Sequence, residues 1–530
     1  MDSGIQLLTG LDQAVIGLYL IGVVGVGLLV ARRRAGTEAF FLNSRASKWP
    51  VIGLALVAAN ISSSTLVGLA GAAYANGISV YNYEWTAAPM IVLSCALVMP
   101  VILRARIFTM PEFLERRYAP FARTYFSALT ILLNVLLDTA GTLFAGALMF
   151  RMLAPEVPLW QVAAVLAGIT GLYSVTGGLR SLLATEVVQA VVLLVGGLVI
   201  TVFAFQHAGG WHEVMTRVPP EKLSLIRPAD DPAMPWTGLV IGIPIMGFYF
   251  WCSNQFMMQQ VLSAQSLDQA RWGSLFAALL KLPVLVFMVL PGAAALLIFP
   301  DLRHPDEVYP RLIFGLLPHG LMGLVIAGFL AAMMSTLAST YNAASTLLAM
   351  DFVARFRPKT SEAALVQTAR WATAVFAAVS VAWVPVLEHA SSSLMQYLQG
   401  MLSYTVPPIA ALYVAGIFWP RANASGAAAA LSVGALTGAA LFLAIQVFHV
   451  LPMHFLIAAG VIFGFSLAAL ALVSLMTAPP DVERVGPMTF RLADWRAETE
   501  VLRSRPWFQN YRILSGLLLV LTAAVVWTFR

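Results

Sequence analysis

The amino-acid sequence predicts an all-α integral membrane protein that crosses the bilayer about fourteen times. Of its 530 residues, 60% are hydrophobic and only 11% are charged, whereas a soluble protein would carry about 25% charged residues. The apolar residues form blocks of roughly 20 residues, the length that a helix needs to cross ~30 Å of hydrocarbon. Short polar connections separate these blocks, and the alternating pattern of an outer-membrane barrel is absent.

The predicted spans follow one another along the whole chain. The longest loops, at residues 207–235 and 477–511, are each shorter than a typical soluble domain. We therefore expect a single membrane domain over residues 1–530. The predicted spans lie near residues 12–31, 50–72, 79–103, 124–150, 158–179, 182–206, 236–262, 272–300, 321–354, 367–388, 392–417, 424–448, 453–476 and 512–529.

The distribution of Lys and Arg predicts the orientation of these spans. With the N-terminus outside, the inner loops hold 23 of the 31 basic residues, the outer loops hold seven, and Lys281 lies in a span. This asymmetry follows the positive-inside rule, and the inner basic loops would meet anionic lipid. We expect a multi-pass protein of the plasma (inner) membrane with both termini extracytoplasmic. Prominent inner basic residues are Arg32, Arg33, Arg34, Arg45, Lys48, Arg116, Arg117 and Arg123.

The remaining bulk features exclude several other classes of protein. Cys95 and Cys252 both lie inside apolar blocks, so neither a disulfide framework nor a metal cluster is expected. Topology accounts for the net charge of +6, so we expect no nucleic-acid partner, and no obligate protein partner is evident. The first apolar block runs into basic residues rather than a cleavage site, which indicates a retained span.

Four charged residues lie well inside predicted spans, namely Glu84, Asp138, Glu186 and Lys281. Charges at membrane depth are costly and usually functional, although a structural pair that joins two helices would also explain each one. Function is the preferred interpretation for Glu84 and Lys281. For Asp138, the two interpretations are equally supported.

The second span contains a polar run, Asn60-Ile61-Ser62-Ser63-Ser64-Thr65. Asn and Ser compete for backbone hydrogen bonds and weaken a helix, so we expect local unwinding here. Free carbonyls at membrane depth are tolerated only where they line a cavity or bind an ion. The alternative is close helix packing through small residues.

The seventh span has a comparable interruption at Pro244, Gly247 and residues 251–255. Interrupted helices at corresponding positions of two halves indicate an inverted-repeat transporter, and spans two and seven are five apart. The single domain would then comprise a first span with its inner loop, two repeats and three additional spans. These parts would be residues 1–49, 50–206, 236–417 and 418–530.

The ninth span can supply ligands for a monovalent cation. A hard cation prefers neutral oxygens, and Ser335 and Thr336 offer two adjacent hydroxyls. The carbonyls of Ala58 and Ile61, in the unwound part of span two, and that of Ala332 can complete the set.

At these residues the chain resembles the solute:sodium symporter family, in particular its sodium/glucose cotransporter branch. The resemblance implies a LeuT-type 5+5 inverted-repeat core, alternating access, and sodium-driven import of a sugar or related polyol. The matching stretches are Thr109 to Tyr118, Thr176 to Leu179, Phe250 to Gln255, Ser335 to Asp351 and Gln399 to Pro408.

The resemblance also implies roles for single residues in ion binding. The family's sodium site falls on the five residues proposed above from their chemistry, Ala58, Ile61, Ala332, Ser335 and Thr336. A carboxylate on the sodium exit path falls on Glu186, where Asp is usual, and Ala338 stands where relatives with a second ion site have a hydroxyl. Both departures favour one sodium per cycle.

The substrate positions of the sugar branch match in part. Glu84, Lys281 and Gln399 fall on hydrogen-bonding positions and Asn60 on the helix-break asparagine, which suits a polyol; Trp251 joins them. Thr65, Ala87 and Gly247 depart from the usual residues and widen the site. The gate positions are Leu69, Tyr83 and Met395 outside and Phe250 inside, where Tyr is usual and Tyr249 is adjacent.

Three alternatives and one open residue remain. A uniporter or sensor would not need the hydroxyls of Ser335 and Thr336, which are present. Another small solute, such as a monocarboxylate, sialic acid, an amino acid or a vitamin, is an alternative cargo, although an anion would favour an arginine that the site lacks. The spans hold no enzyme motif, so no enzyme is expected. Asp138 would pair with a cationic group of the solute or with Lys281.

Overall fold

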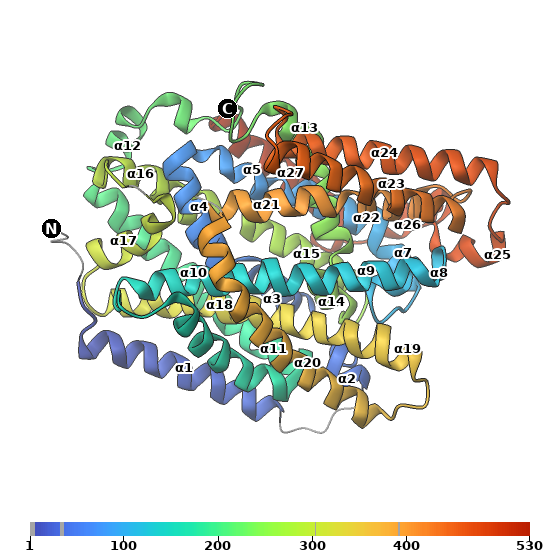
Figure 1. Ribbon diagram of the computed structural model, residues 1–530, viewed down its shortest axis with the longest axis horizontal. Coiled ribbons are helices and arrows are strands. Elements are labelled where there is room, and N and C mark those ends of the chain that lie inside the picture. Colours follow the sequence, from blue (N-terminus) through green and yellow to red (C-terminus); the bar gives the residue numbers. More distant parts are fainter. Residues whose placement is uncertain (1–5, 32–36, 303, 391–392) are drawn as a thin grey trace.

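The computed structural model describes residues 6–31, 37–302, 304–390 and 393–530, and these residues are almost entirely helical (Figure 1). Within them no β-strand forms, and the two isolated bridges join Ser47 to Ala264 and Arg227 to Pro235. The basic cluster Arg32, Arg33 and Arg34 falls outside the described residues, as do the side chains of residues 172–178.

The helices follow the predicted spans closely. The α-helices are α1 (Gly10–Ala31), α2 (Thr37–Leu42), α3 (Trp49–Asn60), α4 (Ser63–Asn76), α5 (Asn82–Trp85), α6 (Ala87–Leu93), α7 (Met99–Arg104), α8 (Met110–Arg117), α9 (Pro120–Leu133), α10 (Ala140–Arg151), α11 (Leu159–His207), α12 (Trp211–Arg217), α13 (Trp236–Phe248), α14 (Gln255–Leu262), α15 (Leu267–Lys281), α16 (Leu290–Ile298), α17 (Val308–Leu316), α18 (Leu321–Leu347), α19 (Ala354–Phe356), α20 (Glu362–Ala390), α21 (Leu394–Thr405), α22 (Pro407–Phe418), α23 (Ala424–Phe442), α24 (Phe455–Met476), α25 (Val482–Val485), α26 (Leu492–Arg503) and α27 (Tyr511–Thr528). Segments of π-helix continue several of them, at Ser94–Val98, Asn134–Thr139, Tyr249–Ser253, Leu285–Val289, Leu348–Val353 and Leu443–Val447.

Among the described residues, 11 helical segments are long and apolar enough to cross a bilayer. Two further pairs reach that length together but are bent, α3 with α4 by 59° and α21 with α22 by 51°. A shorter apolar helix covers Leu159–Gly171. A helix therefore lies in every predicted span, and the chain is a multi-pass helical membrane protein.

The helix α11 corrects one boundary. Two separate helices were expected at 158–179 and 182–206, but a single helix of 49 residues runs from Leu159 to His207. Its two halves nevertheless lie beside the same part of α18. Leu166 packs near Met333, and Glu186 accepts a hydrogen bond from Ser339, whereas 20 residues of straight helix would separate them by ~30 Å. The helix is therefore not straight between Leu166 and Glu186, and both of its halves pack against α18.

The break between α3 and α4 forms where the polar run predicts it. Ile61 and Ser62 are extended, with ψ of 96° and 172°. The hydroxyl of Ser62 accepts the amide of Thr65 at 3.0 Å, so the run caps its own new helix. The seventh span is interrupted in the same way at Asn254, which is extended and whose side chain accepts the amide of Phe256 at 3.0 Å.

The break between α21 and α22 was not predicted from the sequence. It falls at Val406, directly before Pro407 and Pro408. Proline has no amide hydrogen and clashes with the preceding turn, so two consecutive prolines explain the break. Three interrupted spans thus meet in the middle of the molecule.

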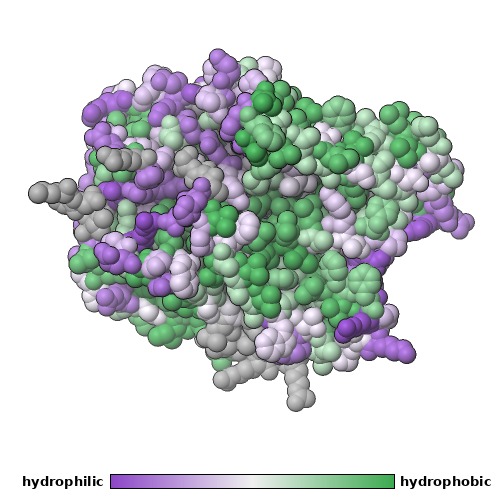
Figure 2. Space-filling view, viewed as in Figure 1, coloured by the Kyte–Doolittle hydropathy of each residue, from purple (hydrophilic) through white to green (hydrophobic). Residues whose placement is uncertain are grey.

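The two sides of the membrane are separated in space. In Figure 1 the first turn of α1, α12 and α17 lie at one end, and α8, α19 and α25 lie at the other. Hydrophilic residues gather near both ends in Figure 2, and hydrophobic residues cover much of the surface between them. The loops predicted to lie outside and those predicted to lie inside therefore occupy opposite ends.

Candidate functional site

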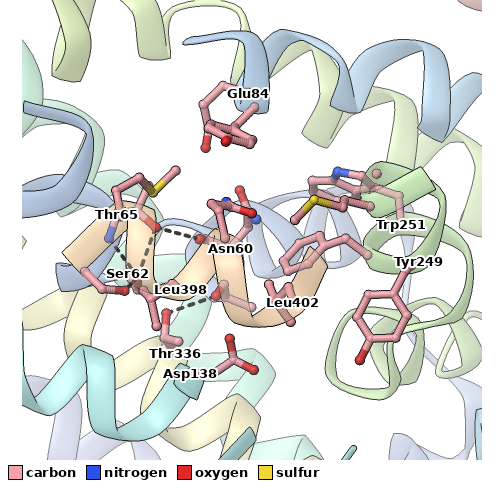
Figure 3. Close-up of a pocket in the computed structure, with 18 of the residues that line it drawn as sticks. Asn60, Ser62, Thr65, Glu84, Asp138, Tyr249, Trp251, Thr336, Leu398 and Leu402 are labelled. Atoms are coloured by element: carbon pink, nitrogen blue, oxygen red, sulfur yellow. Dashed lines mark hydrogen bonds between the residues drawn. The ribbon is translucent and has the colours of Figure 1, made fainter. Parts of the chain in front are cut away.

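A cavity of about 130 Å³ lies beside the break between α3 and α4 (Figure 3). Its walls come from helices that are distant in sequence, so it exists only once the spans have packed. It is lined by Ala59, Asn60, Ser62, Ser64, Thr65, Tyr83, Glu84, Thr86, Asp138, Thr142, Ile243, Met246, Gly247, Tyr249, Phe250, Trp251, Phe256, Lys281, Thr336, Met395, Leu398, Gln399, Leu402 and Val406.

All of the predicted substrate residues line this one cavity. The helix break contributes Asn60 and Thr65, and the other four residues come from four further elements, which are α5, the π-helical segment after α13, α15 and α21. The predicted substrate residues in the lining are Asn60, Thr65, Glu84, Trp251, Lys281 and Gln399.

The charged centre of the cavity is an ion pair between Lys281 and Glu84, whose side chains are 2% and 8% exposed. The Lys281 ammonium also donates a hydrogen bond to the side-chain oxygen of Asn60. It lies 6.0 Å from the ring centre of Trp251, within reach of a cation–π contact. Removing two charges from water is costly. The attraction between the two side chains and the hydrogen bond to Asn60 offset that cost.

Further polar groups surround that pair. The side-chain amide of Gln399 makes no hydrogen bond within the described residues, while its backbone oxygen accepts from Ser403 at 2.8 Å. Thr65 donates to the backbone oxygen of Asn60 at 3.4 Å. The cavity thus offers a carboxylate, an ammonium and an amide to one small polar molecule.

The gate positions divide into two groups. Tyr83, Met395 and Phe250 line the cavity, and the Phe250 ring packs 5.3 Å from Trp251. Leu69, in contrast, is fully buried within α4 and does not reach the cavity wall. Tyr249 lines the cavity beside Phe250, so both aromatic side chains stand at this position.

The predicted sodium ligands lie where α18 meets the broken helix. Thr336 on α18 donates to the carbonyl oxygen of Ala59 at 2.9 Å and so ties α18 to the end of α3. Because the helix stops at Asn60, no backbone amide of the described residues reaches the carbonyl oxygens of Ala58 or Ile61. Free carbonyls beside hydroxyls are the donor set that a hard cation prefers.

Glu186 is fully buried and contacts the same region. One of its oxygens accepts from Ser339 at 2.5 Å, from Gln260 at 3.2 Å and from Ser335 at 3.5 Å. The other oxygen has no partner in the described structure. The sequence analysis missed Ser339 and Gln260; Ser339 follows Ser335 by four residues and therefore lies on the same helix face.

Asp138 also lines the cavity, from the π-helical segment that joins α9 to α10. The expected pair with Lys281 does not form, because Lys281 is held by Glu84 and Asn60. Ser62, Ser64 and Thr142 are further polar lining residues that the sequence analysis did not assign to the site. The small hydroxyls of the polar run were the available signal for the two serines.

The sequence analysis also missed Asp306, which binds the first residue of α21. Asp306 lies in the loop before α17, and its carboxylate accepts the amide of Leu394, the first residue of α21, at 3.0 Å. Burial raises the pKa of Asp306 to about 6. Since α21 carries Met395 and Gln399, this cap fixes one wall of the cavity.

Comparison with known proteins gives a consistent result. A family model described as the sodium:solute symporter family matches residues 40–434. Sodium/glucose cotransporter 1 of Oryctolagus cuniculus is 32% identical, over 91% of this chain and 81% of that protein. A sodium/mannose cotransporter of Bos taurus is also 32% identical, over 91% and 89%.

Solved structures share the fold at lower identity. A Na⁺-coupled sialic acid symporter superposes with a TM-score of 0.78 and 19% identity, over 89% of this chain and 99% of that chain. Mhp1, a nucleobase-cation-symport-1 family transporter, superposes with a TM-score of 0.57 and 14% identity, over 87% and 99%. At these identities the likeness shows a common fold.

Proposed function

This chain belongs to the sodium:solute symporter family, and we propose that it imports a sugar or a related polyol together with sodium. The observation that carries the proposal is the cavity, in which Glu84, Lys281, Asn60 and Gln399 converge beside an unwound helix. The relatives named above transport glucose and mannose by their names, which agrees with a polyhydroxylated solute.

The sodium ion is assigned to the junction of α3 and α18. Its ligands would be the carbonyl oxygens of Ala58, Ile61 and Ala332 and the hydroxyls of Ser335 and Thr336. The ion would replace the hydrogen bond between Thr336 and Ala59 and bind both helices. Glu186, next to Ser335, would attract the ion as it leaves toward the inner side.

The solute is assigned to the cavity that Asn60 lines. A carboxylate accepts hydrogen bonds from two hydroxyls, and Lys and Gln donate to hydroxyl and ring oxygens. Hydroxyls of the solute would therefore insert between Glu84 and Lys281 and bond to Gln399. The indole of Trp251 would cover an apolar face of the ring.

Transport follows by alternating access in a 5+5 inverted-repeat core, with residues 50–206 and 236–417 as the two repeats. The breaks at Ile61, Asn254 and Val406 supply flexible points at the level of the cavity. Coupling is the difference in sodium affinity between the outward-open and inward-open states. The membrane potential supplies about 2.3 kcal/mol per charge per 100 mV, and both termini would be extracytoplasmic.

No arginine lines the cavity within the described residues. A carboxylate solute would need a desolvated cationic partner, and the one lysine is already paired with Glu84. A polyol without a carboxylate is therefore favoured over a monocarboxylate or sialic acid as the cargo.

The test is uptake of labelled glucose, mannose and several non-sugar solutes into proteoliposomes that contain the full chain, with an inward sodium gradient against potassium. We expect sodium-dependent accumulation of a sugar. The double variant Ser335→Ala/Thr336→Ala should need more than tenfold more sodium, because two ligands worth about 1.5 kcal/mol each are lost.

Thr368→Ala is the matched control, because this hydroxyl bonds only to its own helix on the exposed side of α20. Equilibration without accumulation would indicate a uniporter and contradict sodium coupling. Accumulation of only a non-sugar solute would leave the ion site intact and refute the sugar assignment.

A further inference from the structure

Asp138 is a carboxylate on the cavity wall that has no partner in the described structure. Among the described residues it forms no ion pair and accepts no hydrogen bond, because Lys281, the basic residue of the cavity lining, is bound to Glu84 and Asn60. It lies on a π-helical segment, Asn134–Thr139, and such segments are frequent at functional sites. Ionisable residues at this depth usually pair with another group or face a water-filled cavity, and they mark the paths of solutes and ions.

The neighbours of Asp138 on its helix are also unsatisfied. Asn134 and Thr142 lie four residues before and after it and are 1% and 0% exposed. Among the described residues, neither the amide of Asn134 nor the hydroxyl of Thr142 has a hydrogen-bond partner. A buried polar group without a partner is costly, and Thr142 lines the cavity beside Asp138, so a molecule that enters the cavity can bond to it.

The charges of the cavity do not balance. Among the described residues, the charged groups in its lining are Glu84, Lys281 and Asp138. The first two neutralise each other, which leaves one negative charge. Figure 3 shows Asp138 on the opposite side of Asn60 from Glu84, so the excess charge lies at a second end of the cavity.

We propose that the solute carries a protonated amine, as an amino sugar or aminated polyol does, and that Asp138 binds this amine. The proposal rests on the proposed function and adds the charge of the solute. An ammonium donates three hydrogen bonds, which the carboxylate of Asp138 and the adjacent hydroxyl of Thr142 can accept. The hydroxyls of the same molecule bind Glu84, Lys281 and Gln399.

An inorganic cation is a poorer occupant of this end of the cavity. The sodium ligands assigned above are neutral oxygens. Ser335 and Ala332 are buried away from the cavity lining, whereas Thr336 lines the cavity and lies beside Asp138 in Figure 3. Asp138 faces the space that the solute enters. A charge-assisted hydrogen bond is worth about 1.5–3 kcal/mol, which corresponds to roughly 10–100-fold in affinity.

The experiment compares three sugars in proteoliposomes that contain the full chain: glucose, glucosamine and N-acetylglucosamine, at a pH where the glucosamine amine is protonated. N-acetylglucosamine keeps the nitrogen but removes its charge. We expect glucosamine to compete with the transported tracer at least tenfold better than either neutral sugar. Each glucosamine should also move one more positive charge across the membrane than each glucose.

Variants connect this preference to the carboxylate. Asp138→Asn should lose the preference for glucosamine, and Asp138→Glu should retain most of it. Asp494→Asn, which removes a half-exposed carboxylate of the inner loop, is the matched control and should keep the full preference. Thermal unfolding of each purified variant verifies that it is folded.

The outcomes separate the two proposals. If glucose and glucosamine compete equally and Asp138→Asn changes neither, the amine assignment is wrong while sodium-coupled sugar import stands. If Asp138→Asn weakens sodium activation equally for every sugar, the carboxylate serves the ion, and the amine assignment is again wrong. If no sugar accumulates with sodium, the proposed function itself fails.

Discussion

The buried pair of Lys281 and Glu84 allows a structural role to be separated from solute binding. Both side chains are almost fully buried, so Lys281→Met leaves the Glu84 carboxylate desolvated without a counter-charge. Removing one partner of a buried pair typically costs about 3–5 kcal/mol, whereas replacing both partners by apolar or neutral groups is often neutral or stabilising. We therefore expect Lys281→Met to be strongly destabilised and Lys281→Met/Glu84→Gln to recover most of that loss.

The assay measures thermal unfolding of the purified protein in detergent, followed by sodium-dependent uptake. If the two residues bind the solute, the stable double variant should still fail to accumulate it. Arg503→Met is the control, because its partner Glu500 is largely exposed and such pairs contribute little. A single variant as stable as the parent, or a double variant as unstable as the single one, would refute the desolvation argument. Normal uptake by the double variant would remove Lys281 and Glu84 from the solute site.

Further predictions concern stability. Because burial raises the pKa of Asp306 to about 6 from 3.8, its ionised form opposes folding, and stability from this residue falls as pH rises through that interval. Asp306→Asn keeps an acceptor for α21 and should raise stability by about 1–3 kcal/mol at neutral pH and by little below pH 4, measured by thermal unfolding. Burial raises the pKa of Glu498, but hydrogen bonds and charge from Arg271 outweigh burial and hold that pKa below its usual range. Glu498→Gln should therefore lose about 1.5–3 kcal/mol at neutral pH, and the difference from the parent should vanish as acid protonates the carboxylate. Gly292→Ala should destabilise by about 1–3 kcal/mol, since its new methyl group would lie 2.3 Å from the carbonyl oxygen of Ala70; Gly17→Ala, with open space around it, should not.

Local rules explain why part of the site was predictable. The polar run after Asn60 was expected to unwind because its own hydroxyls can satisfy the backbone, and Ser62 does cap α4. The charged residues were candidates because the bilayer penalises every charge at that depth. Neither argument depends on which helices are neighbours, and both apply to a single span taken alone.

Partner choice was not predictable in the same way. The sequence alone left Lys281 free to pair with Asp138, but the packing of α15 against the α5 region joined it to Glu84. Packing also buried the side chain of Leu69, on α4, and brought Ser339 to Glu186. These contacts depend on how helices far apart in sequence are rotated about their axes, and a rotation of one residue turns a side chain by about 100°.

The sequence by itself determined the membrane class of this protein, the approximate spans, and the separation of the two sides by charge. These properties follow from transfer free energies that each segment expresses alone. Only the tertiary structure decided that both halves of α11 pack against α18, that the break at Val406 faces the cavity, and that Asp138 has no partner among the described residues. The physical reason is that close packing of several helices sets which polar groups meet, and hydropathy carries no information about that rotation.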